Sequence, residues 1–334
     1  MYNSYIKDIC FHVPPDVITN DDLAKVMDTS DEWITTRTGI QKRHTVKDSK
    51  QGPADLAVIA AEKLIIKQNI NKEDIDFVVF ATSTPDRFVP GSGSMFQDKL
   101  GLKNIGALDI RQGCAGFVYA LSVADQFIKT GQYQNILVVG AEVQTPQLDF
   151  DNDGRGTAVL FGDGAAVALL SRTKNKDKGI LSFHLHSDGK FIDELGTLAP
   201  SSTLTDIINE ELIQQRKHHI HMNGREVFKH AVRRFPEVIQ EGLNYNNLTV
   251  NDVDLVIPHQ ANYRITKSVQ EQLKIDKAKV FSNIHKYGNT TAASVGIALT
   301  EALESGKIKD NNLITLAAFG AGWYWCSLIM RWGK

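Results

Sequence analysis

Stretches of strand length with clustered apolar residues alternate along the chain with stretches of helical periodicity. Strands are predicted at 6–13, 76–81 and 135–140. Helices are predicted at 53–68 and 114–130, where apolar residues recur at spacings of three and four. Because strands separated by helices pair mostly in parallel, this order predicts an α/β protein built on parallel sheets.

Capping residues and glycines refine this picture in two places. The polar run 19–22 predicts the start of a helix that continues through Met27. Gly162 and Gly164 interrupt the apolar run 159–170, which favours a glycine-broken pair of strands there.

The second half of the chain repeats the pattern of the first at an offset of about 175–178 residues. The matched elements, in order, are segments 74–80 and 252–258, the turns at Cys114 and Asn289, and segments 135–139 and 312–316. A nearly constant offset over three elements indicates an internal duplication rather than a chance similarity.

The charged stretch 174–179 separates the two patterns. We therefore expect two halves, 1–173 with Cys114 and 174–334 with Asn289, arranged about a pseudo-twofold axis. The helix starts that carry these two residues would then face a shared cleft.

Composition narrows the class of protein. The 334 residues are 42% hydrophobic and 23% charged, which is typical of a soluble globular protein. A net charge of −2 creates no field that would attract nucleic acid, and no apolar run is long enough to cross a bilayer. Three scattered cysteines and a first segment unlike a signal peptide favour the cytoplasm.

Cys114 follows a glycine and starts the apolar helix 114–130. Unpaired N–H groups and the positive end of the helix dipole favour the thiolate at such a position. The small neighbours Gly113, Ala115 and Gly116 would let a substrate approach the sulfur. A buried structural cysteine is the commoner role of a free thiol, so this stretch alone leaves both roles open.

Three further groups could complete a site around this thiol. His259 follows the strand predicted near 252–258, at the sheet edge where α/β proteins bind ligands, although a lone histidine there is more often structural. Asn289 could cap the next helix or face a cleft. The glycine-rich turn 318–322 could aim N–H groups at an oxyanion or be an ordinary tight turn.

A thiol, a histidine, an asparagine and a glycine-rich turn have a coherent chemistry together. The thiolate would accept an acyl group from a thioester, and two N–H groups, one from Cys114, would hold the tetrahedral oxyanion. His259 and Asn289 could hold the oxygen of a second thioester as it becomes an enolate. That combination suits decarboxylation of a malonyl thioester and attack on the acyl-cysteine.

The sequence resembles the β-ketoacyl-acyl carrier protein synthase III family of the thiolase superfamily over essentially its whole length. The motifs that carry the resemblance lie at 29–39, 114–116, 155–165, 222–228, 258–262, 288–294 and 319–322. The resemblance implies a five-layered αβαβα thiolase-like fold from two duplicated halves, in a homodimer. It implies a condensing enzyme without cofactor or metal, which takes an acyl group from acyl-CoA and joins it to malonyl-acyl carrier protein. The 3-oxoacyl product would serve fatty acid or related secondary-metabolite biosynthesis.

The resemblance also implies roles for single residues. Cys114 would be the nucleophile, and His259 and Asn289 would serve decarboxylation. The N–H groups of Cys114 and Ala321 would form the oxyanion hole. The other implied sites are coenzyme A contacts at Thr29, Trp33, Arg37, Arg155 and Asn223, an acyl-pocket residue at Phe88, in its own or a partner's pocket, and a carrier-protein docking residue at Arg264. Without the resemblance, ordinary packing would be the preferred role of Trp33, Arg37 and Arg155.

The chain departs from the family pattern in three places. Residues 151–154 are about one residue longer than usual, segment 196–219 is longer, and the bulky Trp323 and Tyr324 follow the glycine-rich turn. These departures favour an acyl group longer or more unusual than acetyl, as in relatives that make alkylquinolone or resorcinol-type precursors.

Other functions compatible with these motifs are an acyltransferase of the same fold that makes an ester or amide, a cysteine hydrolase and an inactive binding protein. Asn289 argues against the ester- or amide-forming acyltransferase, and the buried helix after Cys114 argues against the hydrolase. The intact catalytic set argues against an inactive binding protein. His218, His219 and His221 are spaced like metal ligands, but we expect solvated histidines there.

Overall fold

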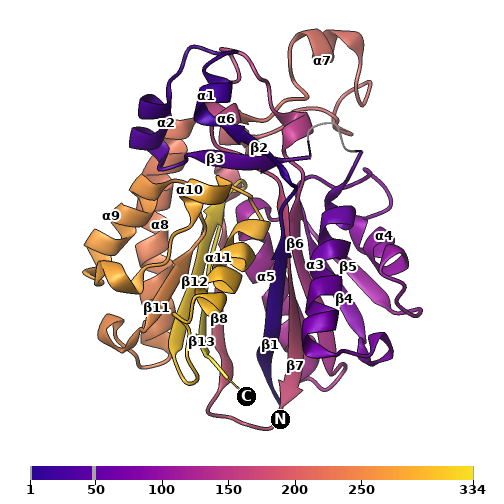
Figure 1. Ribbon diagram of the computed structural model, residues 1–334, viewed down its shortest axis with the longest axis vertical. Coiled ribbons are helices and arrows are strands. Elements are labelled where there is room, and N and C mark those ends of the chain that lie inside the picture. Colours follow the sequence, from indigo (N-terminus) through magenta and orange to yellow (C-terminus); the bar gives the residue numbers. More distant parts are fainter. Residues whose placement is uncertain (1, 47–49, 334) are drawn as a thin grey trace.

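Five layers of secondary structure, α–β–α–β–α, make up the computed structural model of the chain, which describes residues 2–46 and 50–333 (Figure 1). The central layer consists of α5 (Gly116–Lys129) and α11 (Ala293–Glu304), and a sheet packs on each side of it. The outer helices are α3 (Pro53–Gln68) and α4 (Ser92–Lys99) on one sheet and α8 (Gly224–Tyr245) and α9 (Tyr263–Leu273) at the other. The thiolase-like architecture expected from the sequence is confirmed.

The first sheet has the strand order β1-β7-β6-β4-β5. β4 (Phe77–Ala81) pairs in parallel with β5 (Gly106–Ile110) and β6 (Asn135–Glu142). β7 (Gly164–Thr173) pairs antiparallel with β6 and with β1 (Asn3–His12). β4 and β6 are almost entirely buried because helices cover both faces, whereas the edge strand β5 is exposed.

The second sheet repeats this arrangement in the order β11-β12-β13-β8. β11 (Leu255–Pro258) runs parallel to β12 (Leu313–Gly320), while β13 (Tyr324–Arg331) pairs antiparallel with β12 and with β8 (Gly179–Ser187). These four strands correspond in order and direction to β4, β6, β7 and β1. The shared topology is what an internal duplication predicts.

Most local predictions match the observed elements. The helix at 53–68 has the predicted bounds, and the strands at 6–13, 76–81 and 135–140 are present within a few residues. The glycine-broken strand pair at 159–170 is wrong. Only β7 forms, from Gly164, because Phe161 pairs as an isolated bridge with Asn289 of the other half instead of with a neighbouring strand.

The helix predicted through Met27 is shorter than expected. The side chain of Thr19 and that of Asp22 form a capping box at the start of α1, but α1 covers only Asn20–Leu23. Nearby elements, which lie at one end of the molecule in Figure 1, are α2 (Asp31–Thr38), β2 (Asp16–Thr19) and β3 (Lys42–Thr45).

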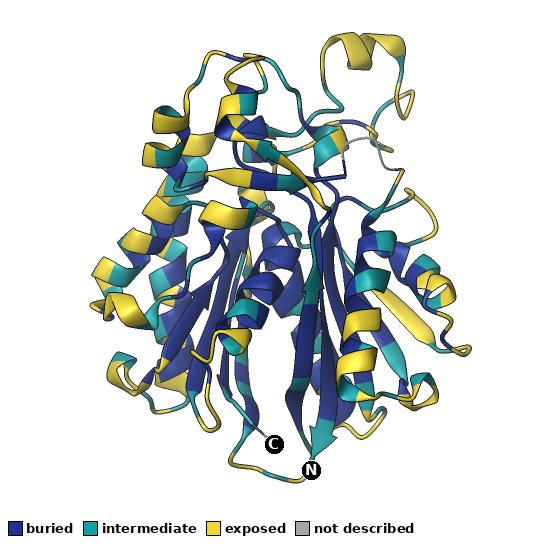
Figure 2. Ribbon diagram, viewed as in Figure 1, coloured by how far each residue is buried: buried dark blue, intermediate teal, exposed yellow. Residues whose placement is uncertain are grey.

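Burial follows the layers (Figure 2). The central helices α5 and α11 are buried along most of their length, as expected of helices enclosed on all sides. Their N-terminal ends therefore lie inside the protein, where the groups that precede them are shielded from bulk water.

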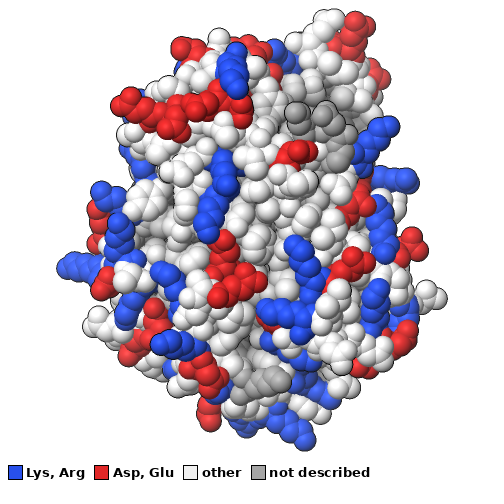
Figure 3. Space-filling model, in the orientation of Figure 1, with Lys and Arg blue, Asp and Glu red and all other residues white. Residues whose placement is uncertain are grey.

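The face seen in Figure 3 is not dominated by charge of one sign. Basic and acidic side chains are interspersed over the face in Figure 3, and acids gather over α1 and α2. Among the residues described, no helix has the length and apolar character needed to cross a membrane.

Candidate active site

Cys114 lies in the 3₁₀ turn η2 (Gly113–Ala115), directly before α5. Gly113 adopts a left-handed φ of +48°, which glycine tolerates best. The end of β12 touches this turn, because a Cβ added to Gly320 would lie 2.6 Å from Cβ of Cys114. This close approach depends on glycine at position 320, whereas a Cβ added to Gly113 would meet Ala321 only at an ordinary 3.6 Å.

Two backbone N–H groups point toward the Cys114 sulfur. They belong to Cys114 itself and to Ala321, and both act to lower the pKa of the thiol. The family resemblance implied these same two N–H groups as the oxyanion hole. In the structure both lie near the sulfur of Cys114.

Burial outweighs these N–H groups in setting the protonation state of Cys114. Loss of solvation, followed by the nearby Glu142 carboxylate, raises the pKa of the thiol to about 12. The expectation that the helix start favours a thiolate is therefore wrong for the substrate-free protein. Burial therefore favours the neutral thiol in the substrate-free protein.

Alkylation of Cys114 should therefore depend steeply on pH. Iodoacetamide reacts with the thiolate, whose fraction rises about tenfold per pH unit below the pKa. We expect the alkylation rate, measured by peptide mass mapping, to rise steadily from pH 7 to 10. A rate that levels off with a midpoint below pH 7 would show a stabilised thiolate instead.

His259 follows β11, as predicted, and its ring is buried. Its backbone N–H donates to the carbonyl oxygen of Ala317 at 2.8 Å, and its Nδ1 lies 2.8 Å from the hydroxyl oxygen of Ser294. That oxygen also accepts the N–H of Gln260 at 2.8 Å.

These contacts assign the proton on the His259 ring. Among the described residues the Ser294 hydroxyl has one acceptor, Nδ1, so it donates there and the ring proton resides on Nε2. Burial lowers the pKa of His259 to about 3, which keeps the ring neutral. Nε2 is buried and has no hydrogen-bond partner within the described chain. His259 therefore presents an unused N–H donor.

Asn289 is held by the other half of the chain. Its backbone N–H donates to Leu160 at 2.8 Å, and its carbonyl accepts the N–H of Gly162 at 3.0 Å. Its side-chain oxygen accepts the N–H of Thr291 at 2.9 Å, which leaves the Nδ2 group free to donate elsewhere. Since α11 starts only at Ala293, Asn289 is not the cap of that helix.

Cys114, His259 and Asn289 line one cavity of about 370 Å³ between the two halves. Trp33, Arg37 and Arg264 also line it, so six of the predicted site residues lie together. Its apolar wall consists of residues from several elements, including Leu160, Phe161, Leu195, Met222, Val227, Phe228, Ala231, Phe235 and Phe319.

Much of this wall was not predicted from the sequence. Phe228, Ala231 and Phe235 lie on α8, which contributes one face to the cavity. Their spacing of three and four residues would have indicated a helical face. The spacing could not have shown whether that face contacts a cavity or the protein core.

The other predicted residues lie outside the lining of this cavity. Arg155 begins α6 (Arg155–Ala158), and its guanidinium lies 5.3 Å from the centre of the Trp33 ring, where that of Arg37 lies at 4.5 Å. Thr29 has a buried hydroxyl oxygen without a partner in the described residues. Asn223 caps α8, accepting the N–H of Glu226 at 3.5 Å. Phe88 is exposed on a surface loop.

Trp323, one of the two bulky residues after the glycine-rich turn, does not line the cavity. The ring is buried and packs on Phe319, His230 and Phe191 at centroid distances of 5.1, 5.9 and 6.0 Å. From this turn, Phe319 and Gly320 line the cavity instead. The ring of Tyr324 contacts Tyr119 at 5.9 Å.

The longer segment 196–219 projects from one end of the molecule, with α7 (Glu210–Gln214) near its tip (Figure 1). β9 (Leu195–Gly196) and β10 (His221–Met222) pair at its base, and Leu195 and Met222 line the cavity. Arg216 ties the segment to the loop before Arg155 through Asp149 at 2.6 Å and through Asp151.

Two of the three histidines near this segment are hydrogen-bonded to backbone carbonyl groups. Nδ1 of His219 lies 3.3 Å from the carbonyl oxygen of Gln147, and Nε2 of His221 lies 2.9 Å from that of Asp193. The His218 ring packs on His219. Within the part of the chain that the structure describes, no group of three metal-ligating side chains is found.

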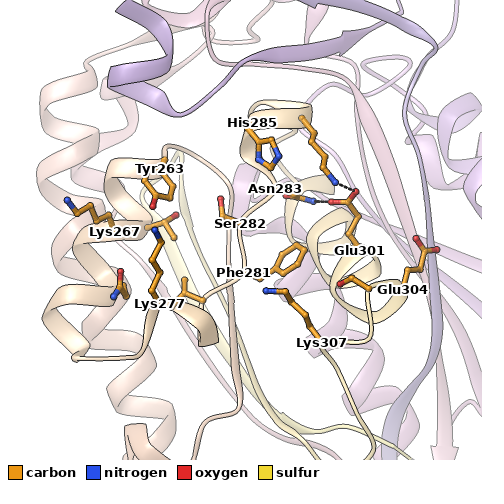
Figure 4. Close-up of a pocket in the computed structure, with 15 residues that line it drawn as sticks. Tyr263, Lys267, Lys277, Phe281, Ser282, Asn283, His285, Glu301, Glu304 and Lys307 are labelled. Carbon is orange, nitrogen blue, oxygen red and sulfur yellow. Dashed lines mark hydrogen bonds and ion pairs between the residues drawn. The ribbon is translucent and has the colours of Figure 1, made fainter. Parts of the chain in front are cut away.

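A larger hollow of about 720 Å³ lies on the outer surface, between α9 and the end of α11 (Figure 4). Phe281 forms part of it, and Lys277 and Lys307 extend over it. Lys286 and Asn283 bind Glu301 at its edge, at 3.0 and 2.8 Å. None of the three candidate catalytic residues lines it, so the smaller cavity is the candidate active site.

Comparison with known proteins gives one consistent family. Residues 108–189 match the family model of 3-oxoacyl-[acyl-carrier-protein (ACP)] synthase III, and residues 243–332 match the model of its C-terminal part. A β-ketoacyl-[acyl-carrier-protein] synthase III of Caldanaerobacter subterraneus subsp. tengcongensis is 42% identical over 328 residues, covering 97% of this chain and 96% of that protein.

Solved structures show the same likeness. The crystal structure of 3-oxoacyl-[acyl-carrier-protein] synthase III from Aquifex aeolicus VF5 has a TM-score of 0.89 at 40% identity, covering 98% of this chain and 100% of that one. A priming β-ketosynthase of a polyketide biosynthetic pathway has a TM-score of 0.88 at 27% identity, covering 99% and 96%.

Proposed function

Because this chain belongs to the 3-oxoacyl-[acyl-carrier-protein] synthase III family, we propose that Cys114, His259 and Asn289 carry out its acyl transfer and decarboxylative condensation. The chain is a β-ketoacyl synthase III-like condensing enzyme, an acyltransferase. The assignment of residues is supported above all by one cavity that holds a thiol, two N–H groups at its sulfur and two further N–H donors.

In the first half-reaction, the sulfur of Cys114 attacks the carbonyl carbon of an acyl-CoA. The tetrahedral oxyanion accepts the N–H groups of Cys114 and Ala321. The carbon–sulfur bond to coenzyme A then breaks, and the leaving thiolate takes the proton that Cys114 loses. The products are acyl-cysteine and free coenzyme A.

In the second half-reaction, a malonyl thioester loses carbon dioxide. The electron pair of the broken bond forms an enolate, whose oxygen accepts Nε2–H of His259 and Nδ2–H of Asn289. The enolate carbon attacks the acyl-cysteine, and the carbon–sulfur bond to Cys114 breaks. A proton returns to the sulfur, and the product is a 3-oxoacyl thioester.

Substrates enter past aromatic and basic residues. Trp33, Arg37 and Arg155 suit the adenine ring and phosphates of coenzyme A, since guanidinium groups stack on aromatic rings and pair with phosphates. Thr29 and Asn223 would contact the same substrate, and Arg264 would receive the malonyl-acyl carrier protein. The scheme uses coenzyme A thioesters as substrates and calls on no cofactor.

We further propose a homodimer formed at β5. This edge strand is exposed and pairs only with β4 among the described strands, and Leu108, Phe88 and Val89 expose large apolar side chains. An unpaired strand edge readily pairs with a second copy, which would also carry Phe88 toward the partner's acyl pocket. Sedimentation of the full chain tests this, and an active monomer would refute it.

Two further assignments complete the proposal. The halves 1–173 and 174–334, joined between β7 and β8, act as one catalytic unit because each supplies part of the cavity. The protein works in the cytoplasm, which three free cysteines favour.

The function and its acyl preference are tested together with a series of acyl-CoA substrates from acetyl to decanoyl. The enzyme is supplied with malonyl-acyl carrier protein, and carbon dioxide and 3-oxoacyl product are measured. We expect condensation with a graded preference for chains longer than acetyl, because each added methylene in an apolar pocket contributes only about 1–3 kcal/mol. A clear acetyl optimum, unchanged when 200–215 is shortened, would contradict the preference, and no release of carbon dioxide would refute the function.

A further inference from the structure

The candidate mechanism leaves one buried carboxylate near the nucleophile without a role. Glu142 ends β6, and its side chain is inaccessible to solvent. It accepts the backbone N–H of Ser83 at 3.0 Å and the hydroxyl of Thr84 at 2.7 Å. A buried carboxylate is costly unless many donors surround it, so this position calls for an explanation.

Glu142 and Gln144 also contact the other half of the chain. Glu142 accepts the backbone N–H of Ala292 at 3.4 Å, and Nε2 of Gln144 donates to the hydroxyl oxygen of Thr291 at 3.0 Å. Both contacts are buried and span about 150 positions in the sequence. Together, Glu142 and Gln144 form a clamp, the β6 clamp, on the turn that follows Asn289.

The clamped turn has an unfavourable backbone conformation. Thr291 has a φ of +47°, which β-branched residues rarely adopt. Contacts from elsewhere must hold it there. The N–H of Thr291 donates to Oδ1 of Asn289 at 2.9 Å, so the position of Thr291 determines which way the Asn289 amide faces.

We propose that Glu142 and Gln144 are positioning residues, which hold Thr291 and Ala292 so that Nδ2 of Asn289 faces the enolate oxygen. The inference rests on the proposed function of Asn289 and extends it. Under this proposal, two side chains of the first half set the orientation of Asn289, which belongs to the second half.

The surrounding hydrogen-bond donors explain a carboxylate at position 142. Burial raises the pKa of Glu142 to about 7, although the Thr84 and Ser83 hydrogen bonds lower it. A carboxylate accepts from all the surrounding donors, while an amide would turn an NH₂ group toward some of them. The Cys114 thiol is a titratable neighbour whose pKa Glu142 raises.

The test separates positioning from general stability. The variants are Gln144→Leu, Gln144→Glu and Glu142→Gln, with Asp125→Asn as the matched control. Asp125 is a fully buried carboxylate on α5 that binds Ser4 at 2.6 Å and Lys129 at 3.0 Å, away from the clamp. Acyl loading by intact mass, carbon dioxide release and thermal unfolding are measured for the full-length enzyme.

We expect Gln144→Leu and Glu142→Gln to load acetyl or a longer acyl group without slowing. Condensation should fall in kcat on the order of 10²-fold, because a displacement of about 1 Å can have that effect. KM for the malonyl thioester should change little. Gln144→Glu should retain activity, because the Thr291 hydroxyl can turn to donate to a carboxylate, and Asp125→Asn should show no selective loss.

Loading and condensation that fall together with the unfolding temperature would overturn the inference, as would unchanged condensation in both variants. If Glu142→Gln does not fold, the comparison of Gln144→Leu with Gln144→Glu decides alone. Failure of the wild-type enzyme to condense would instead refute the proposed function. Condensation that is lost in Asn289→Ala but kept in the clamp variants would refute only the positioning role.

Discussion

Replacing Cys114 with alanine should abolish both acyl loading and condensation. The reaction forms a covalent bond to the sulfur, and removal of a nucleophile from a comparable covalent mechanism lowers kcat on the order of 10⁶-fold. Intact mass after incubation with acyl-CoA should show one added acyl group in the wild type and none in Cys114→Ala.

Cys10→Ala is the matched control, because Cys10 is also a buried free cysteine but lies on β1. This variant should load one acyl group at the wild-type rate. Peptide mapping that finds the acyl group on Cys10 or Cys326 would remove Cys114 from its proposed role. Loading of Cys114→Ala would have the same consequence.

Removal of either His259 or Asn289 should separate the two half-reactions. His259→Ala and Asn289→Ala should still accept the acyl group, because the N–H groups near the sulfur belong to the backbone of Cys114 and Ala321. Condensation should fall about 10²- to 10³-fold in each, the usual effect of losing one oxyanion donor. Because both donors serve one oxygen, the double variant should lose less than the product of the two effects.

Controls for this prediction are other buried side chains of the same types. His184→Ala and Asn283→Ala remove side chains that contact Ser182 and Glu301 respectively, outside the cavity. Neither should alter the ratio of loading to condensation. Because burial lowers the pKa of His259 to about 3, its protonation should not reduce condensation between pH 5 and 8. Normal condensation by Asn289→Ala would refute the assignment.

The layered fold could be predicted because its signals are local. Helix 53–68 has helical apolar spacing and a proline at its start, and the structure reproduces its bounds. The duplication was visible because two sheets of the same order need the same succession of apolar and polar stretches. The strand pair predicted at 159–170 does not form, because Phe161 pairs with Asn289, which is distant in sequence.

The candidate site, too, could be predicted from the sequence only in part. Cys114, His259 and Asn289 could be named as candidates from the sequence, because each follows a strand or turn signal and because few residue types perform this chemistry. The apolar wall on α8 and the β6 clamp could not be named. A helical stripe does not reveal what it faces, and the residues that Glu142 and Gln144 hold lie in the other half of the chain.

By itself, the sequence determined the order of elements, the duplication and the candidates for the reactive groups, since periodicity and residue type are properties of short segments. Only the tertiary structure decided the protonation states of Cys114 and His259 and the direction of the Asn289 amide. Protonation depends on burial and on neighbours such as Glu142, and the amide direction depends on Thr291 and the side chains that hold it. The burial of these side chains and their contacts with Glu142 and Thr291 arise only when distant segments pack together. The pattern of residues in a short segment therefore does not predict them.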